Sequence, residues 1–184
     1  IQETFNIALQ DHKENKLRSA EKLYKKILLL DPKHFDAIYL LGTVYFQTQK
    51  FVKAKIKFQK AFQIQPNHAT LCNNFGATLI QLGEYQKAIN YFIKAIQIQP
   101  NYAHAYNNFG SVLIEVEQQE KAISYLQKAI QIQPNLTDAH VNLGLAFKEL
   151  GEFQKAIDSF QKTIQIQPRN IKAHQNLMES YERI

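Results

Sequence analysis

Asparagine is the residue type whose spacing in this sequence points most clearly to a chemical role. It recurs 34 residues apart at Asn74, Asn108, Asn142 and Asn176, and two such intervals before Asn74 stands Asn6, with Leu40 at the position between them. A carboxamide has one acceptor and two donors, so it can bind both the N–H and the C=O of a passing peptide backbone. A row of them would select an extended chain by its conformation rather than by its residue types.

A second asparagine precedes two members of this series, at Asn73 and Asn107, while Phe5 and Tyr39 stand at the same phase earlier in the chain. Asparagine is a middling helix former, so its return at one phase of a helix needs a reason. Two reasons stay open. The carboxamides bind a peptide, or they form hydrogen bonds with neighbouring helices of the protein itself.

No residue pattern indicates catalysis or a metal. The histidines His140 and His174 share a phase of the 34-residue interval, but no third ligand lies at a matching phase. The sequence also lacks a glycine-rich phosphate-binding loop and a nucleophile with a phased base. We therefore expect no enzymatic activity, no metal site and no cofactor.

The elements that position these asparagines follow from the prolines. The string IQIQPN at 96–101 looks like a strand because apolar and polar residues alternate, but it returns at 130–135, and the five prolines lie at 32, 66, 100, 134 and 168, always 34 residues apart. That period is typical of helix-turn-helix repeats. Because proline is common just after a helix, each IQIQ is predicted to be the last turn of a helix.

The period divides the chain into five repeats and a terminal helix, at 1–34, 35–68, 69–102, 103–136, 137–170 and 171–184. A glycine at the eighth position of four repeats is expected to face a small residue of the partner helix: Ala54, Ala88, Ala122 or Ala156. The fifteenth position holds Gly83 and Gly151, which supply the left-handed conformation that ends a helix. Gln49 and Glu117 at the same phase imply a different or strained turn.

These positions resemble the tetratricopeptide repeat family along the whole chain. The second repeat carries the family's pattern at Leu41, Gly42, Tyr45, Ala54, Phe58, Ala61 and Pro66, and the third at Phe75, Gly76, Leu79, Ala88, Phe92, Ala95 and Pro100. The resemblance implies an all-α, right-handed superhelical solenoid, formed as a single domain over residues 1–184. The phased asparagines are also similar to those in the superhelical repeats of the O-linked N-acetylglucosamine transferases.

The same resemblance implies that the first helix of each repeat lines a concave groove. The residues expected to bind a peptide there are Asn6, Tyr39, Leu40, Phe46, Asn73, Asn74, Asn107, Asn108, Asn142 and Asn176. Tyr39, Leu40 and Phe46 are expected to form an apolar patch that fixes the register of the bound chain, since backbone contacts alone cannot do so.

Composition narrows the class of partner. The net charge of +6 arises mainly in the first two repeats, from lysines that spread around more than one helix face, and no arginine-rich or base-stacking motif accompanies them, so nucleic acid is not expected. No apolar run is long enough to cross a bilayer, so no membrane association is expected. One cysteine is compatible with a reducing compartment, and the expected location is cytoplasmic.

We therefore expect a non-catalytic module that binds an extended protein segment. Two alternatives remain: the substrate-recruiting region of a larger enzyme such as a glycosyltransferase, and a self-associating scaffold. The chain starts at Ile1 and looks like part of a longer protein. At the other end, exposed Met178, Tyr181 and Ile184 would let a mainly monomeric chain associate weakly through its ends.

Overall fold

The computed structural model describes residues 1–184, and every regular element in it is an α-helix. The helices are α1 (Gln2–Lys13), α2 (Leu17–Leu30), α3 (Phe35–Gln47), α4 (Phe51–Ile64), α5 (Ala69–Gln81), α6 (Tyr85–Ile98), α7 (Ala103–Glu115), α8 (Gln119–Ile132), α9 (Thr137–Glu149), α10 (Phe153–Ile166) and α11 (Ile171–Tyr181). The prediction of an all-α fold is confirmed, since the chain contains 11 helices and no strand.

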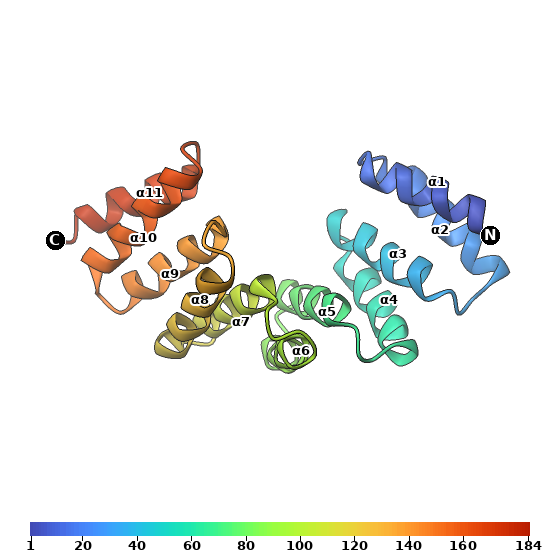
Figure 1. Cartoon of the computed structure of the whole chain (residues 1–184), viewed down its shortest axis with the longest axis horizontal. Coiled ribbons are helices and arrows are strands. Elements are labelled where there is room, and N and C mark those ends of the chain that lie inside the picture. The colour runs from blue at the N-terminus through green and yellow to red at the C-terminus, as the bar shows by residue number, and fades with distance from the viewer. The chain divides into compact units, whose positions relative to one another are not determined.

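Each predicted repeat holds one hairpin of two helices, and α11 follows the last hairpin (Figure 1). The alternating IQIQ strings are helix ends, as predicted, because α6, α8 and α10 end at Ile98, Ile132 and Ile166, two residues before a proline. Proline cannot continue the helix and disfavours helical geometry in the residue before it. None of the helices has both the length and the apolar character needed to cross a membrane.

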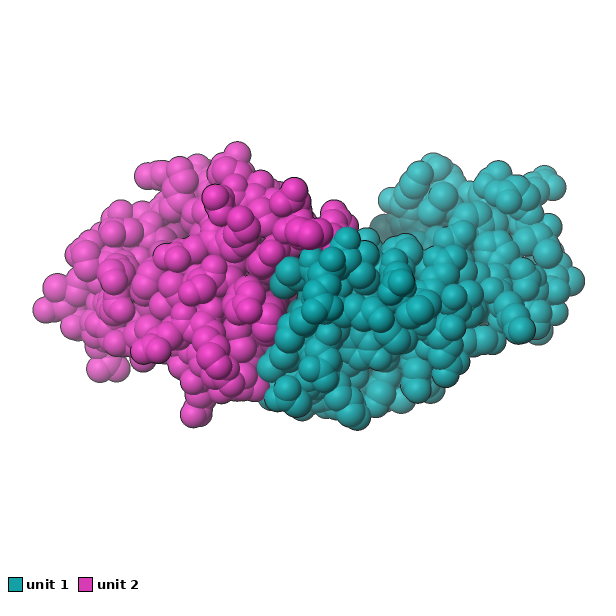
Figure 2. All heavy atoms as spheres, turned by 60° about the horizontal axis from the view of Figure 1, so that its bottom comes forward, with its two compact units in different colours: residues 1–98 teal, residues 99–184 magenta.

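The chain forms two compact units, residues 1–98 and residues 99–184 (Figure 2). The first unit contains α1 to α6 and the second contains α7 to α11. Within each unit the two helices of a hairpin pack together, and the second helix packs against the first helix of the next hairpin. The first helices α3 and α5 also contact each other, as do α7 and α9, and α9 and α11.

The eighth-position glycines are needed for close packing, but their main neighbour differs from the prediction. A Cβ added to Gly76 would lie 2.7 Å from the ring of Phe92, and one added to Gly110 would lie 2.5 Å from Cγ of Leu126. These neighbours stand at the 24th position of the repeat. The alanine at the 20th position is fully buried, yet only Ala122 is among the nearest neighbours, through its backbone oxygen. The large side chain fills the space that glycine leaves.

All five turns inside the hairpins share one backbone conformation. Gly83 and Gly151 have φ of +71° and +75°, as expected for a helix-ending glycine, and Asn15, Gln49 and Glu117 have φ of 60°, 56° and 59°. Gln49 and Glu117 therefore form the same turn in a strained version and not a different turn. A side chain in this region crowds the following carbonyl, at a cost of roughly 1–2 kcal/mol.

Candidate functional site

The predicted asparagines all lie on first helices. Asn73 and Asn107 are buried, with 6% and 5% of their surface exposed, while Asn6 is exposed. The remaining members of the series are half-buried, namely Asn74 on α5, Asn108 on α7, Asn142 on α9 and Asn176 on α11. Burial thus separates the fifth position of the repeat, which lies between helices, from the sixth, which reaches the surface.

In the second unit a hydrogen bond between carboxamides links two hairpins. Asn142 Nδ2 on α9 donates to Asn107 Oδ1 on α7 at 2.9 Å, and Asn107 Nδ2 donates to Asn108 Oδ1 at 3.2 Å. Because Asn107 is buried, its oxygen needs a donor from the protein. The Asn142 side chain supplies that donor and is held in a fixed orientation by it.

The first unit repeats this link with a different acceptor. Asn74 Nδ2 on α5 donates to the hydroxyl oxygen of Tyr39 on α3 at 2.9 Å, and Asn74 Oδ1 accepts from Asn73 Nδ2 at 3.3 Å. Tyr39 stands at the phase of Asn107. In both units, therefore, the sixth position of one repeat donates to the fifth position of the repeat before it.

Asn74 and Asn142 therefore do form hydrogen bonds with a neighbouring helix of the same protein, which is the second of the two reasons for the recurring asparagines. Each of them uses one of its two N–H groups in this link. Asn142 Oδ1 accepts no hydrogen bond within the protein. The Asn142 carboxamide therefore keeps one acceptor and one donor for another molecule.

The two ends of the series differ from this pattern. Asn6 Oδ1 accepts from Gln2 Nε2 on its own helix at 3.1 Å. Asn176 Nδ2 donates to the carbonyl of Lys172 at 2.8 Å, and its Oδ1 accepts from Lys148 Nζ on α9 at 2.6 Å. The same ammonium binds Glu179 Oε2 at 2.8 Å, and this hydrogen bond lowers the pKa of the Glu179 carboxyl. Asn176 is therefore part of a charged cluster and not of the carboxamide link.

An open pocket of about 220 Å³ lies between the first helices of the second unit. Its lining residues are Asn107, Asp138, Val141, Asn142, Asn170 and Lys172. The pocket is smaller than the roughly 300–1,000 Å³ of small-molecule sites. It offers amide groups and one charge of each sign, which suits a polypeptide better than a compact ligand.

Four of these pocket residues were absent from the predicted site: Asp138, Val141, Asn170 and Lys172. Asp138 and Lys172 both stand at the second position of their repeats, on the first helices that the resemblance assigns to the groove, so this shared phase could have identified them. Asn170 caps α11, because its Oδ1 accepts from the N–H of Ala173 at 3.0 Å. Asn170 precedes the first turn of α11, so it lies outside the helical positions from which the groove residues were predicted.

The apolar residues predicted to fix register lie on α3, and all three are half-buried. The Tyr39 ring packs in an aromatic cluster, with its centroid 6.0 Å from that of Phe58 and 5.4 Å from that of His68. Phe46 packs edge-on against Phe51, at 5.7 Å between centroids. The Tyr39 and Phe46 rings are thus held by aromatic neighbours.

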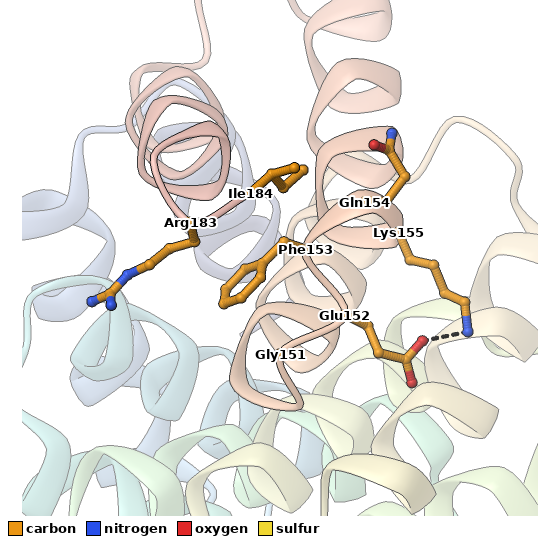
Figure 3. Close-up of a pocket in the computed structure, with 7 residues that line it drawn as sticks. All are labelled: Gly151, Glu152, Phe153, Gln154, Lys155, Arg183 and Ile184. Carbon is orange, nitrogen blue, oxygen red and sulfur yellow. Dashed lines mark ion pairs between the residues drawn. The ribbon is translucent and has the colours of Figure 1, made fainter.

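A second pocket, of about 400 Å³, lies near the end of the chain and shares no residue with the asparagine pocket (Figure 3). It is lined by Gly151, Glu152, Phe153, Gln154, Lys155, Arg183 and Ile184. Glu152 and Lys155 form an ion pair with each other, and Phe153 and Ile184 provide an apolar wall.

The phased histidines have structural partners. The Nε2 groups of His140 and His174 each donate to a proline carbonyl six residues earlier, at 2.8 Å. His34 and His68 cap α3 and α5 through Nδ1, which accepts from a backbone N–H. The structure contains no group of three or more His, Cys, Asp or Glu side chains that could hold a metal ion.

Three family models match the chain. Residues 67–135 and residues 137–170 match two models described as tetratricopeptide repeat, and residues 13–95 match a model described as anaphase-promoting complex, cyclosome, subunit 3. No enzyme family is among these matches. A search of curated proteins finds no match.

Solved structures match over nearly the full chain. YrrB, described as a TPR protein with an unusual peptide-binding site, is 27% identical with a TM-score of 0.74, covering 94% of this chain and 89% of that one. MamA is 26% identical with a TM-score of 0.77, covering 90% and 97%. PilF of Pseudomonas aeruginosa, 19% identical with a TM-score of 0.84, covers 99% and 84% and shows likeness of fold alone.

As many as 502 solved chains match, so likeness of fold does not select a partner. The family models, the 34-residue period and the repeated helix hairpins agree with one another. The chain therefore carries tetratricopeptide repeats, a fold whose members mediate protein–protein interactions.

Proposed function

We propose that this chain binds an extended segment of a partner protein along the first helices of its hairpins. The observation that carries the proposal is the pocket between α7, α9 and α11, where the Asn142 carboxamide keeps one acceptor and one donor. A peptide group presents the complementary pair, one N–H and one C=O. The 27% identity to YrrB, described as having a peptide-binding site, supports the same kind of ligand.

The hydrogen bonds to the protein prepare Asn142 for this role. Its side chain is already held by Asn107, so little rotational freedom is lost when a peptide binds. Each hydrogen bond to a peptide group contributes only about 0.5–1.5 kcal/mol net, because water competes for the same groups. Useful affinity therefore requires contacts beyond Asn142. We propose that Asn74 on α5 and Asn108 on α7 also contact the ligand, through carboxamides whose oxygens already accept one hydrogen bond from the preceding asparagine.

Register is the part that carboxamides cannot supply. Leu40 occupies the asparagine phase of its repeat, is half-buried on α3 and follows Tyr39 in the sequence. We assign Leu40, with Tyr39 and Phe46, the role of receiving one apolar side chain of the ligand. Asp138 and Lys172 at the pocket in the second unit would favour a ligand with charges of both signs.

The test is a peptide array probed with the 184-residue chain, followed by binding measurements on the peptides selected. Changing Asn74, Asn108 and Asn142 together to alanine should weaken binding at least about tenfold, because up to three hydrogen-bonded pairs are lost. The matched control is Asn90→Ala, which changes an exposed asparagine of the second helix α6. Circular dichroism at the assay temperature establishes that each variant remains folded.

Two results would contradict the proposal. One is an array that yields no binding peptide, and the other is a folded triple variant with the affinity of Asn90→Ala. The register proposal stands separately, because it requires that the selected peptides share one position with an apolar preference. Peptides without such a position would remove Leu40 from the site while leaving the asparagines in it.

Several finer points belong to the same proposal. We propose that residues 1–184 form one continuous solenoid and that the repeats are of the kind found in the O-linked N-acetylglucosamine transferases. We also propose that the protein is cytoplasmic and mainly monomeric. The alternative role, recruitment of substrates to an attached enzyme, uses the same peptide-binding helices. Sequencing the full gene distinguishes the two, because an adjoining catalytic domain favours recruitment.

A further inference from the structure

Positive charge is concentrated in the first unit. Residues 1–98 contain 14 Lys and Arg against 7 Asp and Glu, whereas residues 99–184 contain 8 against 9. No acidic residue lies between Asp36 and Glu84, a stretch that includes the whole of α4 and five lysines. This segment therefore has no acidic residues of its own to balance its lysines.

Three of the lysine ammonium groups gather around one ring. The Nζ atoms of Lys25 on α2 and of Lys50 and Lys53 at the start of α4 lie 5.9, 5.6 and 5.9 Å from the centroid of the Tyr45 ring. Tyr45 is buried, with 4% of its surface exposed, so the ring is a fixed support for these groups. An aromatic face attracts cations and partly offsets the repulsion among them.

One carboxylate, that of Glu21, forms ion pairs with two of these three lysines. Glu21 accepts from Lys25 Nζ at 2.6 Å and from Lys50 Nζ at 2.9 Å, so both its oxygens are occupied. The hydrogen bond from Lys25 is the main cause that lowers the Glu21 pKa to about 2. Lys53 forms no ion pair. Two positive charges are thus balanced by one negative charge, and a third has no acidic partner.

The excess continues along α4. Lys53, Lys57 and Lys60 are spaced by four and three residues, which places them on one side of the helix. Burial is the main cause that lowers the pKa of Lys57, and the neighbouring charges of Lys60 and Lys25 lower it further. Lys57 therefore lies between lysines of two helices, where an added anion would lower the repulsion.

We propose that the lysine cluster, defined as Lys25, Lys50, Lys53, Lys57 and Lys60, binds an acidic segment of a partner protein. The row from Lys53 to Lys60 is about 10 Å long at 1.5 Å per residue. That length matches about three residues of an extended chain. A short run of Asp and Glu would face the row and supply the negative charge that the first unit lacks.

The cluster suits an acidic polypeptide better than a nucleic acid. Single-stranded nucleic acids bind on exposed aromatic side chains, and here the Tyr45 ring is buried beneath the ammonium groups. All five cluster members are lysines, without an arginine for two-pronged contact with phosphate or base. A row about 10 Å long also neutralises few phosphates, which gives weak binding at physiological salt.

The test compares two double variants that remove the same charge from the same phases of the repeat. Lys53→Gln with Lys60→Gln changes the cluster, and Lys121→Gln with Lys128→Gln changes exposed lysines of α8 that form no ion pair. Fluorescence anisotropy measures binding of a labelled oligoglutamate peptide, a Gly-Ser peptide of the same length, and an oligothymidylate of matched charge. Low and physiological salt are both used.

Oligoglutamate should bind the unmodified chain, more tightly at low salt because exposed charges are screened less. The cluster variant should bind it about tenfold more weakly, and the α8 variant should bind within about twofold of the unmodified chain. Three results would overturn the proposal: no oligoglutamate binding at low salt, equal losses in both variants, or tighter binding of oligothymidylate than of oligoglutamate. Each leaves the asparagine site untouched, since that site lies on the first helices.

Discussion

The hydrogen bond from Asn142 to Asn107 should contribute to stability, and Asn142→Ala tests it. The substitution removes the donor that lies 2.9 Å from Asn107 Oδ1, an oxygen on a side chain with 5% of its surface exposed. Leaving a buried acceptor without a donor costs about 1–3 kcal/mol. Alanine returns up to about 0.7 kcal/mol as the better helix former.

The expected net loss in the free energy of unfolding is therefore about 1–2 kcal/mol. For a chain of this length each kcal/mol corresponds to roughly 2–4 °C in Tm, so we expect a fall of roughly 2–8 °C. Thermal unfolding followed by circular dichroism measures it. The control, Asn90→Ala, should melt at or slightly above the unmodified chain, because Asn90 is exposed and only the gain in helix propensity applies.

A double-mutant cycle shows whether the bond itself is responsible. On an Asn107→Ala background the acceptor is absent, so Asn142→Ala should cost little or nothing further. The reasoning is refuted if Asn142→Ala melts at or above Asn90→Ala. It is also refuted if the cost of Asn142→Ala is the same with and without Asn107.

Three other predictions address packing, pH and association. Gly76→Ala should lower the free energy of unfolding by about 1–3 kcal/mol, measured as a lower urea midpoint, because its Cβ would lie 2.7 Å from the buried ring of Phe92. The control, Gly83→Ala, has open space around its Cβ and should lose only the roughly 1–2 kcal/mol that a left-handed φ costs. A Gly76→Ala variant as stable as the parent would contradict the close packing. The Glu21 pKa of about 2 lies below its ordinary 4.5, so the stability that the ionised Glu21 contributes is present above pH 4.5 and is lost as the pH falls toward 2. The Tm difference between the parent and Glu21→Gln should therefore shrink between pH 6 and pH 3. A Tm difference that stays constant over this range would argue against a stabilising ion pair. Met178 and Tyr181 are apolar side chains with 65% and 54% of their surface exposed, so sedimentation should detect weak self-association of the chain. The double variant Met178→Lys with Tyr181→Lys should abolish this association. A tight dimer that survives both substitutions would place the association on another surface.

The fold could be predicted from the sequence because its signals repeat. One proline marks a turn weakly, whereas five at one interval fix the length of the unit and the end of every second helix. The neighbour of the eighth-position glycine was predicted less well. Phase shows that Gly76 faces its partner helix, but it does not show that the Phe92 ring extends far enough to fill the space above the glycine.

The positions of the asparagines on the first helices could be predicted by phase, but their hydrogen-bond partners could not. The sequence placed Asn74 and Asn142 on the correct helices, yet their acceptors lie 35 residues earlier, one step away from the interval that identified them. The difference between a separation of 35 and the repeat interval of 34 depends on how far one hairpin is displaced along the next, and the packing of the helices determines that displacement. The same displacement lets Tyr39 act as acceptor in one unit and Asn107 in the other, although the two residue types share no sequence signal.

Contacts within each unit join a helix only to its hairpin partner, to the adjoining helix and to the next first helix. No central core has to be rebuilt when a hairpin is added or removed, since both of its faces meet surfaces made by the same positions of the repeat. Gene duplication could therefore lengthen the chain in steps of one hairpin, and the identical IQIQPN strings at 96–101 and 130–135 are what such copying would leave. Under the proposed function, each added or lost hairpin would change the length of the partner segment that is bound, while the hydrogen bonds and glycine contacts in the remaining hairpins stay as they are.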